Sequence, residues 1–170
     1  MKVETLRELL VHELEDLYDA ESQLVKALPK MAKAASIPQL REGFEQHLKQ
    51  TKEHVVRIEK AFQMLGEGAT AKKCKGMAGL IREGNEVIKN TEADEAARDA
   101  GLISAAQRVE HYEIAAYGTA RTYAQTLGED AVAELLQTTL DEEAQTDKKL
   151  TSLAESTVNV EAAAEDRRAS

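Results

Sequence analysis

The stretch AQRVEHYEIAAYGTAR, residues 106–121, decides the fold of this chain. Ala106, Tyr117 and Ala120 fall on one stripe at helical spacing, which predicts a helix that buries this face. Glu110 and Glu113 interrupt the same stripe with carboxylates. An apolar helix face that carries two acidic residues predicts a polar site inside a helical bundle.

Three further segments have the same kind of stripe. A first helix is expected from about residue 3 to 35, with Pro29 kinking it or ending it early. A second is expected to start at the turn 36–38, where Ser36 offers an N-cap hydroxyl, and to end before Gly66. The last two are expected at about 94–127 and 129–155, separated by Gly128.

The long connection between the second and third long helices indicates the topology. About thirty residues separate them, and GMAGLIREGNEVIK, residues 76–89, predicts a short helix within this crossover. Two antiparallel hairpins joined by one long connection are typical of ferritin-like bundles. We therefore predict an all-α, ferritin-like four-helix bundle over residues 1–155 and a flexible C-terminal tail over 156–170.

Composition and charge exclude several classes of protein. Aromatic residues make up only 4% of the chain and there are two prolines, which favours helices over sheets. A net charge of −9 argues against binding to nucleic acid or anionic membranes. No apolar run approaches the roughly 20 residues of a membrane span. With one cysteine, Cys74, and no apolar leader, the expected compartment is the cytoplasm.

Polar residues interrupt all four apolar stripes near the middle of each helix. Because the helices rise by about 1.5 Å per residue, these residues are expected to meet in one layer of the bundle. Several buried carboxylates without Lys or Arg on the same stripes would be costly, whereas two metal ions would compensate them. Oxygen ligands with one or two imidazoles suit iron, or else manganese. The expected ligands are Glu21, Gln50, His54, Glu110, Glu113, Glu143 and Asp147.

Other residues leave alternatives open. His47 is either a ligand or a partner of the ligands. Tyr117 hydrogen-bonds a ligand, relays an electron, or is an ordinary core tyrosine. Cys74 is expected to be exposed or half-buried and without a role. His12 and His111 fall off the stripes and are expected at the periphery.

Five stretches make the chain resemble the YciF/YciE-like stress-response family of ferritin-like proteins. They are ELEDLYDAESQLVKALPKMA (13–32), HLKQTKEHVVRIEKAF (47–62), GMAGLIREGNEVIK (76–89), AQRVEHYEIAAYGTAR (106–121) and DEEAQTDKKLTSLA (141–154). The resemblance implies a ferritin-like fold and a link to stress. Rubrerythrin is a more distant likeness, since Glu21 lies in a similar Glu-Ser-Gln context and Glu110 and Glu113 match its Glu-x-x-Glu pair.

The chain departs from the rubrerythrin pattern at two positions. Thr51 stands where that family has the glutamate of its second helix, and Glu143 is followed after three residues by Thr146 instead of histidine. Gln50 with His54, and Glu143 with Asp147, are spaced by four residues and so share a helix face. The site is therefore expected to be a modified version of that centre.

Two functions follow as hypotheses. The first is a dinuclear iron or manganese protein that handles oxygen or peroxide during stress, as a candidate di-iron oxidase or peroxidase. The alternative is a non-enzymatic helical module with a structural metal or polar layer. Leu9, Val25, Ala115 and Ala116 provide apolar surface beyond that of one bundle seam, which predicts a homodimer.

Overall fold

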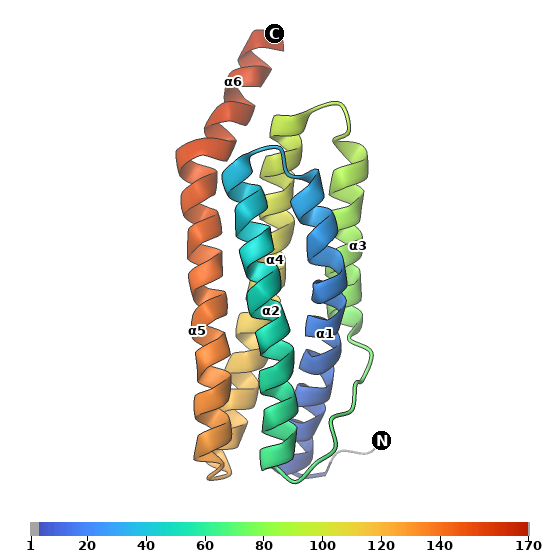
Figure 1. Ribbon diagram of the computed structural model, residues 1–170, viewed down its shortest axis with the longest axis vertical. Helices are drawn as coiled ribbons and strands as arrows, with labels where there is room; N and C mark the ends of the chain where they lie inside the picture. Colours follow the sequence, from blue (N-terminus) through green and yellow to red (C-terminus); the bar gives the residue numbers. More distant parts are fainter. Residues whose placement is uncertain (1–3, 170) are drawn as a thin grey trace.

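The computed structural model describes residues 4–169, which form helices and turns without any strand. The elements are α1 (Leu6–Ala34), α2 (Pro38–Met64), α3 (Lys75–Asn90), α4 (Glu95–Thr126), α5 (Asp130–Leu153), a π-helical turn η1 (Ala154–Val158) and α6 (Asn159–Ala169). In Figure 1, α1 and α2 form one antiparallel pair, α4 and α5 form the other, and α3 lies in the crossover between them. The predicted ferritin-like bundle is confirmed. No helix in this part of the chain is long and apolar enough to cross a membrane.

Helix α1 begins at a capping box and continues past a proline. The Thr5 hydroxyl accepts a hydrogen bond from the Glu8 backbone N–H, and the Glu8 carboxylate accepts one from the Thr5 N–H. Of the two alternatives for Pro29, a kink or an early end, the early end does not occur, because α1 runs on to Ala34, close to the expected end at about 35. Pro29 lies on the exposed side, whereas Leu28 and Ala32 are buried, so packing on both sides of the proline outweighs the lost backbone hydrogen bond.

Helix α2 begins at Pro38, with Ile37 and not Ser36 as its N-cap. Ser36 does not cap the helix because its hydroxyl donates to the Asp99 carboxylate of α4 at 2.5 Å. The same carboxylate accepts from the backbone N–H groups of Ser36 at 2.9 Å and Ile37 at 2.8 Å. The buried Asp99 carboxylate of α4 therefore accepts the hydrogen bonds of the backbone N–H groups at this turn. It also interacts favourably with the positive N-terminal end of the α2 dipole.

Two glycines end helices where the sequence predicts. Gly66 after α2 has φ 73° and Gly128 between α4 and α5 has φ 76°, a left-handed conformation that glycine adopts at low cost. The short turn at Gly128 holds α4 and α5 side by side. Both hairpins therefore bring the midpoints of their two helices to the same level of the bundle.

The apolar interior consists of two separate clusters. The upper core contains Leu24, Leu28, Phe44 and Leu102 among its residues. The lower core has no residue in common with it and contains, among others, Leu10, Leu14, Leu17, Ile58, Phe62, Tyr117, Val132 and Leu136. The midpoints of the four long helices lie between the two cores, where the sequence predicts the polar layer.

Beyond Leu153, the chain continues as helix through η1 and α6 to Ala169. Val158 is fully buried and packs into the upper core, so the folded core extends beyond the predicted boundary at 155. Figure 1 shows α6 projecting from the end of the bundle. The helical conformation of this segment was not predicted, whereas its flexibility stays a prediction.

Candidate metal centre

A layer of buried polar side chains separates the two apolar cores. It receives residues from all four long helices, because each apolar stripe is interrupted at the same height. Its members, all at most 3% exposed, are Glu21 from α1, His47, Thr51 and His54 from α2, Glu110 and Glu113 from α4, and Thr139 and Glu143 from α5. Such a concentration of ionisable groups in a bundle core requires compensation by protons or cations.

The ligand-type atoms of this layer form two groups that share one residue. His47, Glu110, Glu113 and Glu143 make up the first group, in which one such atom from each residue lies within 4.8 Å of the others. Glu21, His54 and Glu143 make up the second group, by the same measure. Glu143 belongs to both, so its two carboxylate oxygens are placed to serve two neighbouring positions.

Many of these atoms have no hydrogen-bond partner although they are buried. Both oxygens of Glu113, and one oxygen each of Glu21 and Glu110, have no hydrogen-bond partner. Glu143 has no hydrogen bond of ordinary geometry either, although its Oε1 lies 2.9 Å from the Nδ1 atom of His54. Both ring nitrogens of His47 are unpartnered too. Buried polar atoms are almost always paired in folded proteins, and each unpaired one costs about 1–3 kcal/mol. This accumulation in one layer indicates a missing charged partner.

His54 is held in place from outside the layer. Its Nε2 lies 2.9 Å from Glu142, and Arg57 binds both oxygens of the Glu142 carboxylate at 2.5 and 3.0 Å. The Nδ1 atom then faces inward, 2.9 Å from Glu143 and 3.3 Å from Glu21. A carboxylate behind an imidazole is the arrangement that fixes ring orientation in metal centres.

The pKa values show how strongly these groups compete for positive charge. Burial by itself would lower the pKa of His54, but hydrogen bonding and charge from Glu143 and Glu21 outweigh it and raise this pKa to about 10. Burial and the Glu143 charge raise the pKa of Glu110 well above its ordinary range, and burial and the Glu21 charge do the same for Glu113. Without a metal, protons are therefore the counterions of this layer.

Tyr117 closes the layer toward the lower core. Its hydroxyl donates to Glu21 Oε1 at 2.5 Å, and the side chain is fully buried. Burial and the Glu21 charge raise the pKa of Tyr117 well above its ordinary value. Of the alternatives for this residue, a hydrogen bond to an expected ligand is the one that the structure contains.

The structure brings together five of the seven expected ligands. Gln50 and Asp147 stay outside the two groups: Gln50 is half-buried beside His47, whereas Asp147 accepts a hydrogen bond from Gln107 at 3.0 Å. His47 joins the first group instead. His47 and His54 are seven residues, or two helical turns, apart, so they share one face of α2. This spacing is the sequence signal that could have placed His47 among the ligands.

Two other residues in contact with the layer were not predicted. Glu142 precedes Glu143 and Arg57 follows His54 by three residues, and each lies on the flank of its helix, not on the apolar stripe. Their role depends on a contact between α2 and α5, through which Arg57 also donates to Thr139 at 3.2 Å. A pattern along one helix cannot reveal such a contact.

Cys74 is buried, so the expectation of an exposed or half-buried thiol is wrong. It is the N-cap of α3, where its sulfur accepts a hydrogen bond from the Met77 N–H and lies 2.9 Å from the Tyr112 hydroxyl. Burial raises the pKa of this thiol. His111 is peripheral as expected, with a side chain 69% exposed.

Comparisons with known proteins agree with the fold. Residues 5–163 match the family model described as domain of unknown function DUF892. The protein YciF of Escherichia coli is 47% identical over 163 residues, which cover 95% of this chain and 98% of YciF. The crystal structure of YciF, described as a stress protein, matches with a TM-score of 0.88 at 46% identity, covering 92% of this chain and 99% of that one.

A second solved structure, YcfI from Rhodopseudomonas palustris, matches with a TM-score of 0.84 at 40% identity. This match covers 88% of the present chain and 95% of YcfI. The family match and the YciF match each extend over nearly the whole chain and agree with the resemblance found in the sequence. The chain therefore belongs to the DUF892 family, and it is similar to the stress protein YciF over nearly its whole length.

Proposed function

We propose that this protein binds two metal ions, iron or manganese, in the layer between its two cores, and that it handles oxygen or peroxide during stress in the cytoplasm. The observation that carries the proposal is the set of buried, unpartnered carboxylate oxygens shared between two groups. Hard oxygen donors with one imidazole in each group suit iron and manganese. The similarity to a stress protein supports the biological setting.

The donor set divides naturally between two ions. Glu21 and His54 would hold one ion, and His47, Glu110 and Glu113 the other. Glu143 would serve both, because it belongs to both groups. Two divalent ions would offset the negative charges that otherwise require protons. When bound, such a pair supplies the electrons and the Lewis acidity for reaction with oxygen or peroxide.

The residues around the centre have roles of their own. The Glu142–Arg57 pair orients His54, so that Nδ1 faces inward. Tyr117 holds one oxygen of Glu21 by a hydrogen bond and thereby directs the other oxygen, which has no partner. The apolar cores above and below keep bulk water away from the layer, which strengthens every electrostatic interaction inside it.

The second candidate function is a structural one. The relative YcfI is described as a candidate structural protein. In that case, the metal or the protonated layer would fix the register of the four helices without reacting with an oxidant. Both functions require the same residues, so a measurement of reactivity has to separate them.

Metal content and reactivity test the proposal in sequence. Protein purified without chelator is expected to carry more than one transition-metal ion per chain by mass spectrometry, and Glu143→Gln is expected to lose most of it. Asp141→Asn is the matched control, since this acidic residue of α5 is exposed and donates no ligand to either group. Content that is the same in both variants would rule out the centre.

Reactivity is then measured on protein loaded with ferrous iron. Its oxidation by hydrogen peroxide, followed by stopped-flow absorbance, is expected to be much faster than that of free iron and to be lost in Glu143→Gln. Iron that binds with full stoichiometry but is oxidised no faster than free iron would refute the enzymatic function. The structural function would then be the one supported.

A further inference from the structure

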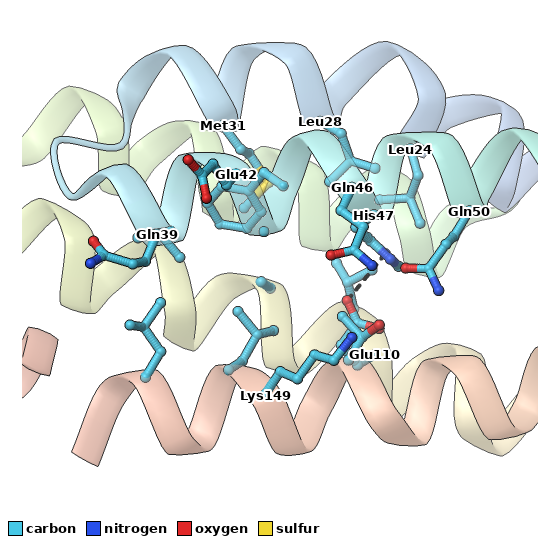
Figure 2. Close-up of a pocket in the computed structure, with 18 residues that line it drawn as sticks. Leu24, Leu28, Met31, Gln39, Glu42, Gln46, His47, Gln50, Glu110 and Lys149 are labelled. Carbon is cyan, nitrogen blue, oxygen red and sulfur yellow. Dashed lines mark ion pairs between the residues drawn. The ribbon is translucent and has the colours of Figure 1, made fainter. Parts of the chain in front are cut away.

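A pocket opens between α2 and α5 and leads from the surface to one side of the layer. It offers about 330 Å³ of space, within the range of about 300–1,000 Å³ for small-molecule sites. Figure 2 shows Gln39 and Met31 toward one end, and His47, Gln50 and Glu110 toward the other. The pocket therefore connects solvent with the group of His47, Glu110, Glu113 and Glu143.

Much of the pocket wall is apolar, and Leu28, Met31, Leu40, Phe44 and Leu153 are among its residues. Figure 2 places Gln39 and Glu42 toward the end away from the layer, and both of these polar residues are exposed. The polar side chains at the inner end belong to the layer itself or adjoin it, and Figure 2 places Gln50 beside His47 there. A complementary ligand needs an apolar body and a single polar head.

The unpartnered imidazole of His47 specifies that head. His47 is 3% exposed, and neither of its ring nitrogens has a hydrogen-bond partner. Nε2 lies 3.3 Å from Glu110, on the side of the layer, which leaves Nδ1 to be satisfied by something else. An N–H at Nδ1 of His47 requires a hydrogen-bond acceptor on the ligand. The amide oxygen of Gln50 can accept a hydrogen bond from the polar head of the same ligand.

A hydroxyl meets both requirements, because it accepts one hydrogen bond and donates another. A carboxylate head would accept from His47 but would add a further negative charge beside a layer whose buried carboxylates already raise the pKa of Glu110. An ammonium head could donate to Gln50 but could not accept from His47. The volume corresponds to roughly eleven water molecules of about 30 Å³ each, which suits a medium-length chain.

We propose that this pocket binds an aliphatic alcohol, with its chain against the apolar residues of the wall and its hydroxyl between His47 and Gln50. Binding as such does not need metal. A role of the alcohol as a substrate of the centre does rest on the function proposed above. Titrations of metal-free protein and of protein loaded with zinc, which has no redox chemistry, keep the two questions separate.

Gly43 offers a way to obstruct the pocket without disturbing the fold. It lies on exposed helix α2 surface at the pocket wall, and a Cβ added there meets no atom within 4 Å. Gly43→Phe should therefore fill the opening while favouring the helix, since glycine is a poor helix former. Gly118→Phe is the matched control, because Gly118 of α4 has the same open surroundings but does not line the pocket.

The experiment is calorimetric titration with 1-octanol, octanoate and octylamine. We expect octanol to bind most tightly, Gly43→Phe to weaken it at least tenfold, and Gly118→Phe to leave it unchanged. Gln50→Leu should weaken octanol about three- to tenfold, as expected for the loss of one hydrogen bond, and should reduce its advantage over the charged probes.

Three outcomes would overturn the proposal. One is the absence of octanol binding in both the metal-free and the zinc-loaded protein, and another is tighter binding of octanoate or octylamine. The third is that Gly43→Phe abolishes self-association and leaves the affinity for octanol unchanged. This result would mean that a second copy of the chain occupies the pocket. A protein that binds octanol but takes up no metal when metal is offered would instead contradict only the proposed metal function.

Discussion

Glu113→Met tests whether the layer is built for a missing cation. Glu113 is completely buried, with 0% exposure, and neither of its carboxylate oxygens has a hydrogen-bond partner. Nothing in the structure therefore offsets the cost of burying this carboxyl group. Methionine has a similar length and volume and a similar helix propensity, so the change removes the polar atoms and little else. Most core substitutions destabilise, whereas this one is expected to stabilise the metal-free protein.

The expected gain follows from the two unpartnered oxygens. Each costs about 1–3 kcal/mol, and the repacking penalty of a volume-conserving swap is below about 1.5 kcal/mol. The free energy of unfolding should therefore rise, within a range of about 0.5–6 kcal/mol and with a central value of about 3 kcal/mol. In a chain of this size, that central value corresponds to a rise in Tm of about 6–12 °C.

Thermal unfolding followed by circular dichroism, with chelator and then with metal, is the assay. Wild-type protein should gain about 2.7 kcal/mol at a metal concentration one hundred times Kd, whereas the variant should gain much less. The variant should thus be the more stable protein with chelator and lose that advantage with metal. A metal-free variant that melts below wild type would refute the reasoning.

Asp99→Leu is the matched control for this experiment. Asp99 is equally buried, but its carboxylate accepts hydrogen bonds from Ser36 and Ile37. The substitution leaves those donors without their partner, so the free energy of unfolding should fall by at least about 2 kcal/mol. Opposite signs for two buried carboxylates would show that hydrogen-bond satisfaction, and not burial, decides the effect.

Three further predictions concern the whole molecule. Metal-free protein should lose stability as pH rises above about 4.5. Glu110 and Glu113 have raised pKa values in the folded protein, so they hold protons that the unfolded chain releases. His54, whose pKa is raised to about 10, acts in the same direction from about pH 6.5 upward. Urea unfolding at about pH 5 and pH 8 checks this, and higher stability at the upper pH would contradict it. Asp147→Asn should keep the wild-type metal content, since Asp147 lies outside both ligand groups; a loss as large as in Glu143→Gln would make it a ligand. The protein should form a homodimer, and light scattering that gives a monomer at tens of micromolar would exclude this.

Most of the fold could be predicted because helical periodicity and glycine stops are local signals. The end of α2 before Gly66 and the turn at Gly128 are set by residues within one helical turn. The prediction failed where a contact from elsewhere in the chain decides. Ser36 does not cap α2 because its hydroxyl donates to Asp99 of α4. Packing against the core likewise decided between the alternatives for Pro29, since α1 continues to Ala34 and does not end early.

The site was predictable to the extent that polar residues interrupt apolar stripes. This signal identified Glu21, His54, Glu110, Glu113 and Glu143, which the structure brings together. It could not rank residues at the edge of a stripe, because a rotation of a fraction of a turn decides whether a side chain reaches the axis of the bundle. His47 was therefore not counted among the expected ligands although it lies in the first group, whereas Gln50 and Asp147 were counted although they lie outside both groups.

The division of the interior into two cores has a consequence for how the sequence can change. Among residues 4–169, no buried side chain described belongs to both cores, and the polar layer lies between them. Substitutions at sites that are far apart and share no partners have additive effects on stability. A change in Phe62 should thus leave the tolerance of Phe44 unaltered, and each end of the bundle can diverge among homologues on its own. Layer residues lack this freedom, since Glu143 constrains choices on all four helices at once.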